Sequence, residues 1–100
     1  MYIRERVVEN ATILDSFTEN VWSTVKYTIQ ITRGSDMYAS DILVLNDGTN
    51  INVSESNIIT NTENSLFTYA FEENSGIISL KITPVSTAVT ARYYRTAIKK

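Results

Sequence analysis

Three carboxylates flank a hairpin that the sequence predicts near its centre, and paired carboxylates can do chemistry. Asp41 precedes the apolar run Ile42–Leu45, Asp47 lies in the turn Asn46–Gly48, and Glu55 follows the next strand-forming segment. Two carboxylates on one face could act as acid and base on a glycosidic bond. Because carboxylates at strand ends usually serve solvation and turn formation, we favour that structural role.

The side chains of Asn46, Asp47, Asn50 and Asn52 supply oxygens of the kind that bind calcium. Their spacing does not match a calcium loop, in which acidic ligands alternate over roughly twelve residues and a glutamate closes the site. Asp47-Gly48 accounts for the segment without an ion, because the pair tolerates positive φ at both central positions of a tight hairpin. We therefore expect a turn here, and no metal or other cofactor.

The stretch Arg92-Tyr93-Tyr94-Arg95, close to Lys99-Lys100, mixes basic and aromatic residues as a polyanion-binding surface does. On a strand, Arg92 and Tyr94 point to one face while Tyr93 and Arg95 point to the other, which splits the basic groups. Tyr and Arg are also enriched at protein interfaces. We favour packing in the core for one tyrosine and protein contact for the rest.

Trp22, preceded by Phe17 and Val21, could form a platform on which a sugar stacks. A lone tryptophan in a small domain more often lies in the core or at an interface. Trp22, Arg92, Tyr93, Tyr94 and Arg95 are therefore the candidate protein-contact residues, and host glycan binding is the weaker alternative.

Two missing residue types exclude most catalytic centres. The chain contains no cysteine and no histidine, which removes thiol nucleophiles, Ser-His pairs and sites that need thiolate or imidazole ligands. Catalysis would depend on carboxylates, lysine or tyrosine alone. We expect the protein not to be an enzyme.

Length, charge and hydropathy limit the classes of function that remain. The 100 residues fit one domain spanning 1–100, and a net charge of −2 gives no general attraction to nucleic acid or to an anionic membrane. The longest apolar run is far shorter than the roughly 20 residues of a membrane-spanning helix. The first residues lack the apolar run of a secretory signal, so we expect the protein to stay inside the cell that makes it, or to be assembled there.

Strands must position these side chains, because apolar residues recur with a period of two. In Val25–Thr32 the apolar residues alternate with polar ones, and Arg33–Asp36 forms a turn before a second strand, Met37–Leu45. Further strands are predicted at Thr49–Ser54, Phe67–Glu72, Ile77–Ile82 and Ala88–Ile98. Phe67–Glu72 and Ile77–Ile82 are predicted to form a second hairpin, joined by the turn Glu73–Gly76.

The N-terminal segment 1–22 has a less regular pattern. Arg6–Val8 and Ala11–Leu14 indicate one bent strand or two short ones, and for Ser16–Trp22 we favour a loop over a turn of helix. About seven strands joined by short turns predict an all-β fold, a single-domain antiparallel β-sandwich of jelly-roll or immunoglobulin-like type.

The order of several motifs resembles a domain of virion structural proteins from tailed bacteriophages, in particular contractile-tailed phages of cyanobacteria and other marine bacteria. The likeness spans residues 12–98, and Asn46 stands where such patterns usually carry a histidine. The segments that carry it, in order, are Ile13–Phe17, Val25–Gln30, Asp41–Thr49, Gly76–Pro84 and Tyr94–Ile98.

The resemblance implies a non-catalytic β-sandwich module of a phage virion, assembled in the host cytoplasm. We expect a capsid decoration or cement protein first, and a tail, neck or fibre component or a carbohydrate-binding adhesion module as alternatives. The expected partners are other virion proteins, from capsid or tail, and copies of the chain itself, with no nucleic acid and no membrane.

Overall fold

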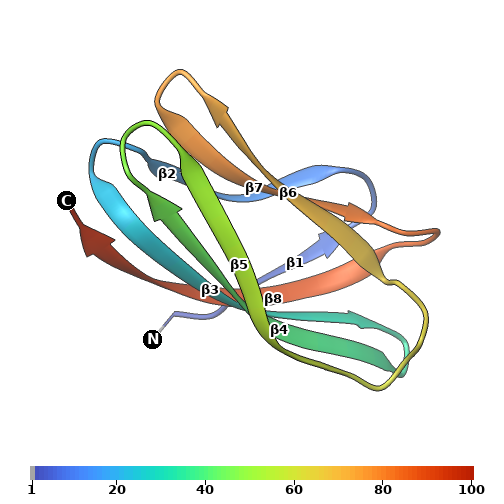
Figure 1. Ribbon diagram of the computed structural model, residues 1–100. Helices are drawn as coiled ribbons and strands as arrows, with labels where there is room; N and C mark the ends of the chain where they lie inside the picture. The colour runs from blue at the N-terminus through green and yellow to red at the C-terminus, as the bar shows by residue number, and fades with distance from the viewer. Residues whose placement is uncertain (1) are drawn as a thin grey trace.

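A computed structural model describes residues 2–100 as strands joined by turns and loops. Two antiparallel sheets pack face to face (Figure 1). One has five strands in the order β1-β8-β3-β4-β5, and the other has three in the order β2-β7-β6. The strands are β1 (Arg4–Val8), β2 (Thr12–Thr18), β3 (Trp22–Arg33), β4 (Asp36–Asn46), β5 (Ile51–Thr60), β6 (Phe67–Asn74), β7 (Ile77–Pro84) and β8 (Val89–Lys99). This confirms the predicted β-sandwich.

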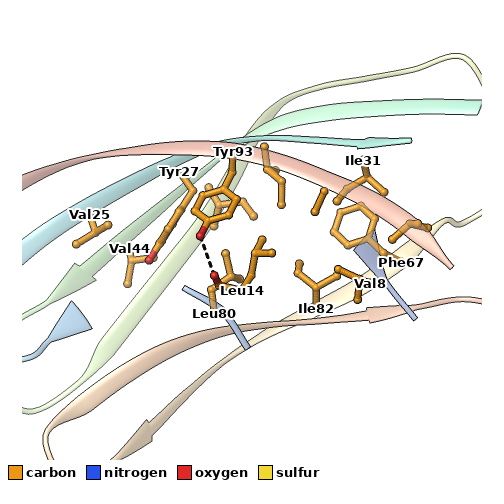
Figure 2. Packing of buried hydrophobic residues seen from close by; sticks show 14 of the residues in the cluster. Val8, Leu14, Val25, Tyr27, Ile31, Val44, Phe67, Leu80, Ile82 and Tyr93 are labelled. Atoms are coloured by element: carbon orange, nitrogen blue, oxygen red, sulfur yellow. Dashed lines mark hydrogen bonds between the residues drawn. The ribbon is translucent and has the colours of Figure 1, made fainter. Parts of the chain in front are cut away.

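The core lies between the inner faces of the two sheets, as the period-two pattern predicts. In β3, Val25, Tyr27, Ile29 and Ile31 are each at most 1% exposed. From the opposite sheet, alternate residues of β7 meet them, and Figure 2 shows Leu80 and Ile82 facing the five-stranded sheet across the core. Burying these aliphatic side chains stabilises the fold by about 1.5–3 kcal/mol each.

The N-terminal segment is more regular than its sequence predicts. β1 pairs with β8, and β2 pairs with β7, so residues 1–22 contribute two separate strands and the count rises to eight. A register shift between Ile13 and Asp15 leaves Leu14 and Asp15 both buried, which breaks the alternation within β2. The expected loop at Ser16–Trp22 is too long: β2 continues to Thr18 and β3 begins at Trp22, so only residues 19–21 form the turn between them.

The hairpin at Asp47-Gly48 forms where it is predicted, between β4 and β5, but its turn is of another kind. The last paired residues are Asn46 and Ile51, so the loop has four residues, and only Gly48 among them has positive φ (92°). The Asp47 carboxylate accepts the N–H groups of Thr49 and Asn50 at 2.9 and 2.7 Å. These side-chain bonds stabilise the wider loop.

The tight two-residue turn occurs instead in the hairpin of β6 and β7. Asn74 pairs with Ile77, and both intervening residues, Ser75 and Gly76, have positive φ, 53° and 80°. This backbone twist matches the twist of the flanking strands. The predicted second hairpin is therefore confirmed.

Candidate functional site

The five candidate contact residues do not form one site. Tyr93 is 4% exposed and its hydroxyl donates to the Leu14 carbonyl at 2.7 Å (Figure 2), so its side chain belongs to the core and not to a contact surface. Arg92 and Tyr94 lie on the outer face of the five-stranded sheet, where Arg92 pairs with Glu5. Trp22 lies at the far end of β3, packed against the core, with the Lys99 ammonium 5.8 Å from its ring centre.

Arg95 turns inward at the edge of the sandwich and binds Asp15, a residue that the sequence did not single out. Asp15 is 7% exposed, and its Oδ2 accepts from Arg95 at 2.7 Å and from the Tyr27 hydroxyl at 2.8 Å. Its Oδ1 accepts from Arg4 at 3.3 Å and lies 3.4 Å from the Tyr93 hydroxyl. The carboxylate belongs to β2, whereas all four partners belong to the five-stranded sheet.

This Asp15 cluster links the two sheets electrostatically. Burial raises the pKa of Tyr27, and the charge of Asp15 with its hydrogen bond raises it further. The tyrosine hydroxyl therefore stays protonated and donates to the carboxylate. Because two arginines neutralise one buried carboxylate, the cluster is a structural ionic network and has no carboxylate left to activate a substrate.

The carboxylates Asp41, Asp47 and Glu55 are not paired for catalysis. Asp41 lies on the outer face of β4, where Asn57 and Thr28 donate to it and lower its pKa. Asp47 lies in the turn, and the N–H groups of Asn50 and Thr49 lower its pKa. Glu55 lies on the inner side of β5. The three groups thus occupy separate surfaces, and two are held ionised rather than ready to donate a proton.

Asn46, where the resemblance leads one to look for histidine, is a structural residue. It is 4% exposed, and its amide donates to the carbonyls of Glu19 at 2.6 Å and Trp22 at 3.3 Å while its carbonyl oxygen accepts from the Gly48 N–H. The side chain therefore ties the β2–β3 turn to the β4–β5 hairpin.

We expect Asn46→Ala to destabilise the fold by about 1–3 kcal/mol, because it leaves the partly buried carbonyls of Glu19 and Trp22 without this donor. Asn50→Ala is the matched control, since the side chain of Asn50 is exposed in the same loop. Urea unfolding at neutral pH measures both. Equal stability of the two variants would contradict the structural role of Asn46.

A hollow of about 480 Å³ lies where the chain crosses from β5 in one sheet to β6 in the other. Figure 1 shows this crossing as the loop that joins the ends of the two edge strands. Leu66 and Phe67 are buried beneath the hollow, and Tyr38, Glu55 and Tyr69 line it half-buried. We call it the β5–β6 hollow. These residues lie in different segments of the sequence, so no local motif predicts the β5–β6 hollow.

Hydrogen bonds fix the polar groups of the β5–β6 hollow. Glu55 Oε2 accepts from the Tyr38 hydroxyl and from Ser40 Oγ, each at 2.6 Å. Burial and then the hydrogen bond to Glu55 raise the pKa of Tyr38 to about 12, and burial followed by the charge of Glu55 raises the pKa of Tyr69. Both hydroxyls are therefore donors at neutral pH.

The raised pKa of Tyr38 predicts a loss of stability in alkali. The unfolded chain releases this proton near pH 10, whereas the folded chain holds it until about pH 12, so the stabilisation is complete below pH 10 and falls as the pH rises toward 12. Urea unfolding at about pH 8 and about pH 11 measures the drop. Tyr38→Phe should make the drop smaller, and an unchanged drop would contradict this origin.

Residues 2–100 show neither a metal-binding cluster nor a membrane-spanning helix. Within that range no group of three or more acidic side chains is arranged to hold a metal ion. None of these residues forms a helix long and apolar enough to cross a membrane.

The two-sheet fold defines the chain as a β-sandwich. No known protein family and no curated protein matches the sequence. Among solved structures, the tailspike protein of Acinetobacter phage vB_ApiP_P1 aligns with 95% of this chain at a TM-score of 0.57 and 11% identity. The chain spans 21% of that protein, so this similarity concerns the fold of a part of it.

Two other tailspike structures align more loosely. The tailspike gp49 of Acinetobacter baumannii bacteriophage Fri1, a capsular polysaccharide depolymerase, gives a TM-score of 0.37 at 12% identity, over 97% of this chain and 19% of its own. The tailspike of Acinetobacter baumannii phage AM24 gives 0.40 at 9% identity, over 99% and 26%.

Proposed function

We propose that this chain is a non-catalytic structural module of a bacteriophage tail, a component of a tailspike or fibre. The observation that carries the proposal is the alignment of nearly the whole chain with part of the vB_ApiP_P1 tailspike. The ordered motifs that resemble virion proteins support it independently. This favours the tail over the capsid decoration role that the sequence first suggested.

The chemistry of the described residues supports a role without catalysis. The chain has neither histidine nor cysteine, Asp15 is neutralised by two arginines, and Asp41 and Glu55 face opposite sides of one sheet. The depolymerase activity named for the Fri1 tailspike belongs to a protein of which this chain spans 19%. We therefore do not assign that activity to this chain.

The outer face of the five-stranded sheet supports protein contacts within the particle. Leu43 and Leu45 of β4 are 44% and 48% exposed, and Ile98 of β8 is 64% exposed. Leu45 and Ile98 lie on either side of Thr24 in β3, and Leu43 lies beside Lys26, two residues further along β3. All three point to the same face as Arg92 and Tyr94. Exposed apolar side chains grouped in this way are typical of surfaces that meet other proteins, here other virion proteins or copies of the chain.

Mass spectrometry of purified particles tests the proposal. Phage heads and tails are separated on a density gradient, and peptides of this chain are quantified in each fraction against the major capsid protein. We expect the peptides in the tail fraction. Their presence in heads alone would restore the capsid decoration role, and their absence from intact particles would end the virion assignment.

A further inference from the structure

The β5–β6 hollow carries negative charge that no cation among residues 2–100 balances. Glu55 and Glu63 both line it, and no lysine or arginine does. Among residues 2–100, the ion pairs neutralise Asp15, Asp41, Glu72 and Glu5, and neither carboxylate of the hollow takes part in one. Glu55 is half-buried, so its charge is less well solvated than that of a surface glutamate, and a cation beside it would be favourable.

Aromatic rings line the same hollow. The Tyr38 and Phe67 rings meet edge to face with centres 5.0 Å apart, and the Tyr69 ring follows with its centre 6.4 Å from that of Phe67. Aromatic faces attract cations within about 6 Å of the ring centre, and they do so more strongly when water is excluded. Rings beside an unbalanced carboxylate suit an organic cation, whose alkyl part packs on the rings while its charge lies near the oxygen.

The walls of the hollow are held in place before any ligand arrives. The hydrogen bonds of Tyr38 and Ser40 to Glu55 both end on Oε2, which leaves Oε1 with lone pairs for a ligand. The loop that rims the hollow is tied down on one side by Asn61, which exchanges hydrogen bonds with Met37 and donates to the Ser35 carbonyl. On the other side Val85 N–H donates to the Leu66 carbonyl at 2.9 Å. Such preorganisation lowers the cost of binding.

We propose that the β5–β6 hollow is a binding site for an alkylammonium group. The ammonium hydrogens are donated to the carboxylate of Glu55, with Glu63 adding to the negative field at the rim, and the attached methylene groups pack against Tyr38, Phe67 and Tyr69. A volume of about 480 Å³ is within the usual range for small-ligand pockets. The same group occurs on a free amine and on a lysine side chain of another protein.

NMR titration of the ¹⁵N-labelled chain tests this site with four probes. The probes are n-butylammonium, N-acetyl-lysine methylamide, neutral n-butanol and anionic butyrate. We expect saturable shifts for both cations at the backbone amides of Tyr38, Glu55 and Phe67–Tyr69, and no saturable shift there for butanol or butyrate. Tighter binding of the lysine derivative would identify a protein side chain as the ligand, and equal or tighter binding of butylammonium would identify a free amine.

Glu55→Gln should weaken butylammonium binding by about tenfold, because it removes the charge from one hydrogen bond while keeping an acceptor for Tyr38. Glu72→Gln is the matched control and should bind as the parent does, since Glu72 lies on β6 outside the hollow and pairs with Lys81. Thermal melting of each variant shows that it is folded.

Three results would overturn the inference. They are equal shifts with butanol, equal affinity of the Glu55→Gln and parent chains for butylammonium, and saturation of the same amides by calcium but not by the amines. None of these bears on the tail assignment, which depends on particle composition.

Discussion

Ile29→Asp is expected to unfold the protein or to reduce its stability by several kcal/mol. Ile29 is 1% exposed at the centre of β3, with β4 on one side and β8 on the other. A carboxylate at this position would lie among aliphatic and aromatic side chains without a partner. The cost is comparable to the whole margin of a small domain, roughly 5–15 kcal/mol. Circular dichroism and urea unfolding measure the effect.

Gln30→Asp is the matched control for that substitution. Gln30 is the next residue of β3 and points to the outer face, where it lies opposite Arg92. The same charge should change stability there by less than about 1 kcal/mol, the usual range for surface substitutions. If Ile29→Asp melted near the parent temperature, or if the control were the more damaging change, the assignment of inner and outer faces would be wrong.

Asp15→Ala is expected to cost about 3 kcal/mol. The substitution leaves the buried hydroxyl of Tyr27 without its acceptor and removes the charge that holds Arg4 and Arg95 against β2. Breaking a buried ion pair from one side typically costs about 3–5 kcal/mol. We expect the lower end because the side chains of Arg4 and Arg95 are 57% and 31% exposed and can be solvated.

Glu5→Ala provides the comparison for Asp15→Ala. Glu5 also pairs with an arginine between β1 and β8, but in that pair with Arg92 both side chains are more than half exposed. Exposed ion pairs contribute about 0–1 kcal/mol. Denaturant unfolding of the two variants under the same conditions should therefore separate them clearly, and similar losses would argue against a special role for the buried carboxylate.

Regular alternation made the central strands predictable from sequence. In β3 the inner residues from Val25 to Ile31 are all apolar and buried, and in β7 the inner residues Ile78, Leu80 and Ile82 are too. Ser79 of β7 is the exception, a polar outer residue that is also buried. In β2 the alternation does not predict burial, because the bulge buries the charged Asp15 next to Leu14. β5 was predicted too short, because an edge strand exposed on both faces shows little alternation of apolar and polar residues. Positive φ at Asn57 also interrupts the regular strand geometry.

The candidate sites were less predictable than the fold because they depend on contacts between distant segments. Asp15 and Arg95 are 80 residues apart in sequence, and the hollow joins Tyr38 of β4 to Tyr69 of β6. The sequence did predict that Arg92–Arg95 would divide between two faces, and this is confirmed. The sequence could not indicate that Arg95 would pair with the buried carboxylate of Asp15, because the two residues become neighbours only when the two sheets pack together.

Electron cryomicroscopy of the intact particle is the most direct test of the proposed tail role. We expect density for a sandwich of five-stranded and three-stranded sheets, about 40 Å long, within the tailspike or fibre. Location of that density on the capsid lattice, or its absence from a particle reconstructed at side-chain detail, would contradict the tail role.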